Sequence, residues 1–134
     1  MIAWLHRLLV HLPIGLLVTA TLIRAHARWR RRPGPETTMM LAIGAAGAWL
    51  ACVTGLAHAY EELRQGEWAE SSMQVLALSH LSCSVSAALL FSAVMLLARR
   101  RDSGPEPRIL PYLEALGLLL LLVTAHLGGL LAHG

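Results

Sequence analysis

Four long apolar stretches, separated by short polar segments, limit how this chain can fold more than any other feature. They cover approximately residues 2–23, 39–59, 73–98 and 109–132. Each is long enough to cross the hydrocarbon core of a bilayer, which takes about 20 helical residues. Because an open sheet in lipid would leave backbone groups unpaired, helices are the expected conformation. The sequence therefore predicts an all-α fold, an integral membrane four-helix bundle that forms one domain over residues 1–134.

The composition agrees with a membrane protein. Of the 134 residues, 56% are hydrophobic and 14% are charged, whereas soluble domains carry roughly a quarter of charged residues. A soluble chain of this length could not bury so much apolar surface in one core. The sequence pI near 9.5 comes from short blocks of arginine and not from a basic face, so nucleic acid is not an expected partner. The expected surroundings are membrane lipids.

The arginines predict the orientation in the membrane. All eleven basic residues are Arg, and nine of them lie in or beside the first and third connections between apolar stretches. The second connection, residues 60–72, carries four Glu and only Arg64. By the positive-inside rule, the first and third connections are cytoplasmic. Both termini are then expected on the outer side of a bacterial inner membrane, in the periplasm of a Gram-negative cell.

Six of the seven histidines are predicted to converge on the outer leaflet, because the chain alternates direction from one span to the next. They are His6, His11, His58, His80, His126 and His133. His11, His80 and His126 lie several residues inside their spans, and the others lie near the interface. Ionisable groups inside a span are costly and usually mark ligands, ion pathways or contacts with partners. The outer end of the bundle is therefore the candidate functional site.

Several neutral imidazoles at one end of a helical bundle are typical of a site for haem b. The flat macrocycle lies between helices and takes an axial histidine from each side. We expect one or two haems, and the sequence does not assign the ligand pairs. The candidate axial ligands are His11, His80, His126 and His133, with His6 and His58 in reserve. Arg7, one turn outward of His11, is a candidate partner for a haem propionate or else extends to the lipid headgroups.

Two other classes of function stay open at this point. Imidazole also binds copper and zinc, so His11, His80, His126 and His133 could form the metal site of a transporter or assembly factor. Alternatively, the chain is a structural anchor in a respiratory or photosynthetic complex, with its histidines on chlorophyll-type magnesium or on no cofactor. Histidines that face one another inside the bundle favour haem, and histidines that point outward favour the anchor. Cys52 and Cys83 are expected to be packing residues or an oxidised pair.

Both ends of the chain carry motifs that resemble a known family. Residues Leu9–Leu16, LVHLPIGL, resemble the VHFPI opening of a widespread family of small predicted membrane proteins of unknown function. Residues Ala125–Gly134, AHLGGLLAHG, resemble its GHLGGxLxHG ending. The chain is most similar to the branch found fused to, or beside, c-type cytochrome domains in planctomycete-type bacteria. Histidines occur in that branch at the positions of His6, His11, His80, His126 and His133, whereas Arg7 departs from it.

This resemblance implies a respiratory setting with a periplasmic c-type cytochrome and other subunits of a membrane complex as partners. The resulting hypothesis is a b-type cytochrome subunit that passes electrons between the quinone pool and that cytochrome. It is expected to be an electron-transfer subunit more than a self-standing enzyme. No glycine-rich phosphate loop, nucleophile elbow or His-Glu-x-x-His pattern occurs. Glu114 is expected in the first turn of the last helix, far from the histidines.

Overall fold

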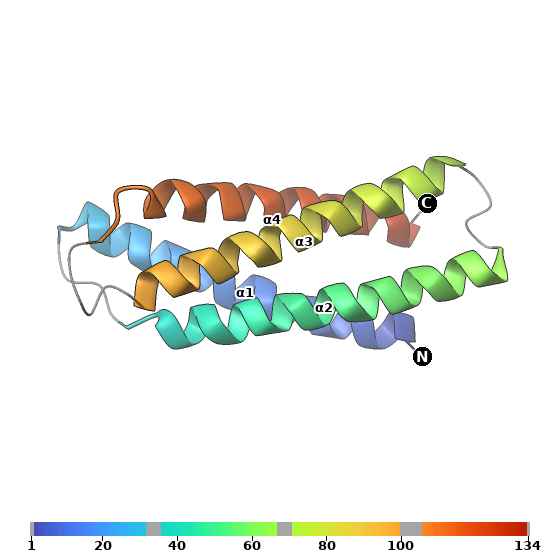
Figure 1. The fold of residues 1–134 in the computed structure, drawn as a ribbon, viewed down its shortest axis with the longest axis horizontal. Helices are drawn as coiled ribbons and strands as arrows, with labels where there is room; N and C mark the ends of the chain where they lie inside the picture. Colours follow the sequence, from blue (N-terminus) through green and yellow to red (C-terminus); the bar gives the residue numbers. More distant parts are fainter. Residues whose placement is uncertain (1, 32–35, 67–70, 100–105, 134) are drawn as a thin grey trace.

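The computed structural model is a bundle of four helices joined in an up-down-up-down arrangement (Figure 1). It describes residues 2–31, 36–66, 71–99 and 106–133, and it has no strand among them. The helices are α1 (Ile2–Trp29), α2 (Thr38–Gln65), α3 (Ser71–Arg99) and α4 (Leu110–His133). All four are long and apolar enough to cross a membrane. The predicted all-α fold of four spanning helices is confirmed.

The helices run past the apolar stretches that predicted them, because polar residues continue a helix until a breaker ends it. The first helix continues to Trp29 and the second to Gln65. After α2, Gly66 takes the left-handed conformation with φ of 77°, and its N–H bonds to the Leu63 carbonyl at 3.2 Å. After α1, Arg31 takes the same kind of conformation with φ of 51°. Glycine is the usual residue at such a position, since it has no Cβ to clash.

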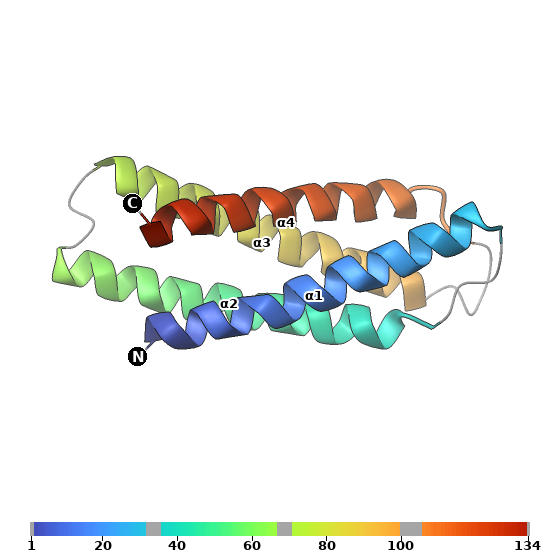
Figure 2. The same cartoon turned by 180° about the vertical axis from the view of Figure 1, so that it is seen from behind.

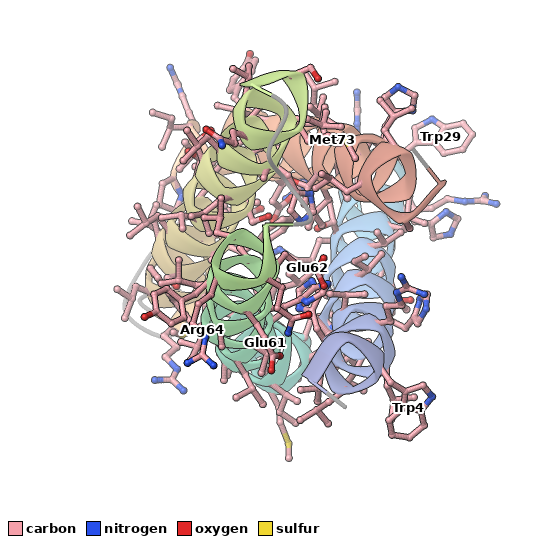
Figure 3. The ribbon with its side chains drawn as sticks, turned by 90° about the vertical axis from the view of Figure 1, so that its right-hand side faces the viewer. Trp4, Trp29, Glu61, Glu62, Arg64 and Met73 are labelled. Atoms are coloured by element: carbon pink, nitrogen blue, oxygen red, sulfur yellow. The ribbon has the colours of Figure 1, made fainter. Side chains whose placement is uncertain are left out.

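We call the two ends of the bundle by their contents. The histidine end holds the start of α1, the end of α2, the start of α3 and the end of α4, and the arginine end holds the opposite ends of these helices (Figure 1). Trp4 and Tyr60 are exposed near the histidine end, and Trp29 and Tyr112 are exposed at the arginine end. Trp4 and Trp29 bound a 26-residue span, roughly 39 Å of helix, and both project away from the bundle (Figure 3). This spacing fits aromatic belts at the two faces of one bilayer.

Helix packing is uneven around the bundle. The α1–α2 and α3–α4 hairpins are closely packed and meet mainly through α2 and α3, whereas α1 and α4 share few contacts. Figure 2 shows α1 running toward α4 at the arginine end and away from it at the histidine end. Gly44 makes room for Leu17, and Gly117 makes room for Phe91, since a Cβ at either position would lie 2.7–2.8 Å from that side chain. Small residues of this kind let membrane helices approach closely.

The core lies in the middle and toward the arginine end. Its fully or almost fully buried side chains include Leu17, Leu41, Phe91, Val94 and Leu110. Toward the histidine end few of the described residues are buried, Pro13 and Ala51 among them. The other interior positions there are half-buried. The protein thus combines a closely packed half with a loosely packed half, and the histidines lie in the second.

Candidate functional site

Three histidines lie half-buried at the histidine end. His6 on α1 is within electrostatic range of both His58 on α2 and His80 on α3, and all three are half-buried. His6 belongs to the α1–α2 hairpin and His80 to the α3–α4 hairpin. The two imidazoles therefore approach from opposite halves of the bundle, as a pair of ligands to one group between the hairpins would.

The hydrogen bonds of His6 define which of its ring nitrogens carries the proton. His6 Nδ1 lies 3.2 Å from Thr54 Oγ1. The Thr54 hydroxyl has one hydrogen, and it points to the backbone carbonyls of Leu50 and Ala51, at 3.0 and 3.1 Å. With the hydroxyl hydrogen in either of those bonds, Thr54 Oγ1 accepts from His6 Nδ1–H. In the neutral ring, Nε2 keeps its lone pair.

His80 is in the same protonation form for a more direct reason. Its Nδ1 lies 3.0 Å from the backbone carbonyl of Thr124 on α4. A carbonyl oxygen can only accept, so Nδ1 must carry the proton and Nε2 is again unprotonated in the neutral ring. Ser84, one turn further along α3, donates to the His80 carbonyl at 2.7 Å. The Thr124 carbonyl of α4 therefore orients the imidazole, whereas the Ser84 bond belongs to the backbone of α3.

Each interior imidazole lies against a glycine of the neighbouring helix. A Cβ on Gly55 of α2 would lie 2.9 Å from His6 Cε1, and a Cβ on Gly128 of α4 would lie 3.0 Å from His80 Cε1. Any side chain at either position would push the ring aside. Gly129, next to Gly128, has nothing within 4 Å of its own Cβ position. The two hairpins thus repeat one arrangement, a histidine that fills the space left by a glycine and donates through Nδ1.

His58 has a different environment from the other two. Its Nδ1 lies 3.4 Å from Glu62 Oε1, one turn further along α2. Glu62 is half-buried, whereas Glu61 and Arg64 beside it are exposed on the outside of the bundle end (Figure 3). A carboxylate can accept Nδ1–H from a neutral imidazole and orient the ring, as the partners of His6 and His80 do. His58 therefore stays a third candidate ligand beside His6 and His80.

The remaining predicted site residues are more exposed than this cluster. His11 on α1 and His126 on α4 are exposed, and so is Arg7, which follows His6 directly in the sequence. The side chain of His133 lies outside the described part of the structure. His11 and His126 stay candidate ligands for a group at the exposed sides of α1 and α4.

The described residues also bear on the copper or zinc alternative. Among them, no three His, Cys, Asp or Glu side chains are grouped so that they could hold one metal ion. Cys52 and Cys83 are free thiols and both are half-buried, as the interpretation of packing residues predicts. The interior cluster is thus a histidine pair with a third histidine near it.

The arginine end contains a buried ion network that the sequence analysis missed. Arg24 of α1 donates through Nε to Glu114 of α4 at 2.5 Å and through Nη2 to Glu106 at 2.6 Å. Arg28 also reaches both carboxylates, with Nη1 at 3.2 Å from Glu106 and Nη2 against Glu114. The side chains of Arg24 and Glu114 are 6% and 1% exposed. This network joins α1 to α4 at the one end where the two helices approach.

The expected first-turn position of Glu114 was wrong, whereas its place far from the histidines agrees with the structure. Glu114 is not in the first turn of α4 but one turn further in, and it is a fully buried partner of two arginines. A signal was present in the sequence, since Glu114 is the one acidic residue inside the last apolar stretch and Arg24 and Arg28 share a helix face at i, i+4. A carboxylate inside a membrane span needs a partner of opposite charge.

Comparison with known proteins identifies the family. Residues 4–134 match the family described as "Predicted membrane protein (DUF2231)". The chain belongs to this family. No curated protein and no solved structure matches it.

Membership in DUF2231 confirms the resemblance drawn from the two end motifs, and the structure gives several motif residues a position. In the first motif, Pro13 packs at 3.4 Å against the Cβ position of Gly47, while His11 faces outward. In the second motif, Gly128 accommodates His80 and Gly129 is open. The family description establishes a membrane protein and supplies no activity, so the function must be argued from the site.

Proposed function

We propose that this member of DUF2231 is a b-type cytochrome subunit that holds one haem b between His6 and His80. The observation that carries the proposal is the matched state of these two residues. They come from opposite hairpins at the same end of the bundle, and each is hydrogen-bonded through Nδ1, His6 with Thr54 Oγ1 at 3.2 Å and His80 with the Thr124 carbonyl at 3.0 Å. Metal-binding histidines have this form, because the outer hydrogen bond orients the ring and leaves Nε2 for the metal.

The packing around the pair also supports a cofactor. The described residues of the histidine end have half-buried interior faces, in contrast with the closed core at the other end. A flat macrocycle needs a slot between helices with small residues beside the ligands. Gly55 and Gly128 are small residues of this kind, and they seat the two imidazoles.

When bound, haem b would supply one-electron exchange at its iron. The residues of this chain would then have separate tasks. Thr54 and the Thr124 carbonyl hold the two rings through their Nδ1–H groups. Arg7, exposed next to His6, is available to pair with a propionate at the rim of the bundle. The apolar helices exclude water on the other sides.

The wider setting in this proposal is a respiratory complex in a bacterial inner membrane, with the histidine end and both termini in the periplasm. The protein would pass electrons between the quinone pool and a periplasmic c-type cytochrome. Two features support this setting. The arginines gather at the end opposite the histidines, which supports the orientation in the membrane. The end motifs resemble the branch associated with c-type cytochromes, which supports the redox partner. A site near the outer surface would be accessible to a periplasmic redox partner.

One observation favours a second candidate, the structural anchor. His11 and His126 are exposed on α1 and α4 within apolar spans, where an imidazole in contact with lipid alone is unfavourable. Another subunit packed on these faces would satisfy them. An anchor needs no haem between His6 and His80, so the two candidates differ in a measurable property.

The test is a reduced-minus-oxidised optical spectrum of the purified protein and of four single variants. The proposal expects a Soret band and a sharp reduced α-band in the wild type. His6→Ala and His80→Ala should abolish or broaden them, because each removes one axial ligand. His11→Ala and His126→Ala are the matched controls and should leave the spectrum unchanged. A protein without a Soret band when isolated with its native partners favours the anchor, and loss of haem in His11→Ala would contradict the assignment of ligands.

A further inference from the structure

We propose that the arginine end carries a binding surface for anionic phospholipid headgroups. The surface consists of Arg30 and Arg31 at the end of α1, Arg108 just before α4, and the aromatic side chains of Trp29 and Tyr112. We call these five residues the α1/α4 patch. This inference concerns the end opposite the histidines and does not depend on the presence of haem.

The charge balance of the described residues leaves the patch positive. Glu106 and Glu114 are both engaged by Arg24 and Arg28 in the buried network. Glu36, the remaining described carboxylate of this end, accepts the N–H of Thr38 at 2.7 Å at the start of α2. Arg30, Arg31 and Arg108 are exposed, and no described carboxylate lies within ion-pair distance of them. Anionic phosphates are the complementary partner.

The buried network also brings the three arginines to the same side. Glu106 binds Arg24 and Arg28, so the chain just before α4 lies against the last turns of α1. Arg108 follows Glu106 by two residues and therefore lies near the end of α1, where Arg30 and Arg31 are. Figure 2 shows the end of α1 and the start of α4 close together. The network and the patch are thus two layers of one structure, with ion pairs inside and, outside, arginines that no described carboxylate pairs.

The two aromatic residues place the patch at the depth of the headgroups. Trp29 is 82% exposed and Tyr112 is 75% exposed, each on one of the two helices of the patch. Rings of this kind gather where hydrocarbon meets water. Guanidinium groups at that depth can donate two parallel hydrogen bonds to a phosphate, which an ammonium group cannot do. The patch therefore fits a phospholipid better than a soluble anion, because the rings contact the lipid below its phosphate.

Arg31 gives an independent reason to assign a role to the patch. Its φ of 51° lies in the left-handed region, where every residue with a Cβ is disfavoured. At the corresponding position after α2 the chain uses Gly66, with φ of 77°. A glycine after α1 would be more stable in the same backbone conformation. The presence of Arg31 there indicates that its side chain is used.

The experiment measures lipid retention by native mass spectrometry after reconstitution of the full chain in vesicles of equal parts phosphatidylglycerol and phosphatidylcholine. Each arginine near an anionic surface is expected to contribute roughly fivefold to the preference for phosphatidylglycerol at low salt. The triple variant Arg30→Gln, Arg31→Gln, Arg108→Gln should lose the preference. The triple variant with Lys at these positions should keep the charge but lose part of the preference. The control, Arg64→Gln, changes an exposed arginine of the other end and should retain phosphatidylglycerol as wild type does.

The variant Arg31→Gly separates binding from folding. It relieves the backbone at Arg31, so the protein should be at least as stable to heat as wild type while it retains less phosphatidylglycerol. Equal retention by wild type and the Gln triple variant would overturn the proposal. So would a wild-type preference that inorganic phosphate removes as readily as added phosphatidylglycerol, because the patch would then bind soluble anions.

Discussion

Replacement of Glu114 by Gln tests the buried ion network directly. The carboxylate of Glu114 accepts from Arg24 and from Arg28, and its side chain is 1% exposed. Gln has the same shape and keeps one acceptor oxygen, but it removes the negative charge. Arg24, itself 6% exposed, is then left with Glu106 as its remaining anionic partner. The variant therefore isolates the cost of leaving a buried guanidinium without its closest counter-charge.

The size of the effect follows from burial. Removal of one partner from a buried ion pair costs about 3–5 kcal/mol, and we expect the lower part of this range because Glu106 still neutralises part of the charge. Glu106→Gln is the matched control. The Glu106 side chain is 22% exposed and its second partner Arg28 is 26% exposed, so its loss should cost about 1 kcal/mol or less. The two substitutions make the same chemical change at different depths.

The assay is the free energy of unfolding in mixed micelles, measured for both variants and for the double variant Arg24→Gln with Glu114→Gln. The double variant should be less destabilised than the sum of the single ones by about 1–3 kcal/mol, since it leaves no uncompensated charge. Equal stability of Glu114→Gln and Glu106→Gln would refute the reasoning. Simple additivity in the double variant would show that Arg24 and Glu114 are not coupled.

Three further predictions concern the histidine end and the orientation. Gly55→Ala and Gly128→Ala should each lower haem affinity roughly tenfold by displacing a ligand ring. Gly129→Ala should have no effect, because its new methyl group meets nothing within 4 Å. Haem titration measures the three affinities, and equal effects at all three positions would contradict the prediction. Thr54→Val removes the acceptor for His6 Nδ1–H and should weaken haem binding by roughly 10–100-fold. Thr54→Ser keeps a hydroxyl and should retain normal haem affinity. A valine variant with normal affinity would show that the hydrogen bond does not orient the ligand. Fusions to a reporter enzyme that is active only in the periplasm test the orientation. The reporter should be active after Gly134 and inactive in the connection between α3 and α4. The reverse pattern would contradict the proposed orientation.

The fold was predictable because a single physical requirement dominates it. Four apolar stretches of spanning length leave helices as the one solution in lipid, and the structure has those four helices. The gathering of histidines at one end also followed from alternating chain direction. Neither result needs knowledge of how a helix is rotated about its own axis.

Rotation about the helix axis is what the sequence could not supply. In a soluble helix the polar face marks the outside, but in these helices both faces are apolar. His6 and His11 are five residues apart and so lie on different faces, and nothing in the hydropathy pattern of α1 tells which face is inside. The structure places His6 against Gly55 and Thr54 and exposes His11. A glycine on the facing helix at the depth of His6 is the signal that could have ranked His6 first.

The most direct test of the central proposal is the haem content of the protein purified from membranes that also contain its native partners, measured as pyridine haemochrome per mole of chain. The account predicts one haem b per chain, with a low-spin spectrum typical of two imidazole ligands. A chain that contains no haem, or a haem that is retained when both His6 and His80 are replaced by Ala, would contradict it.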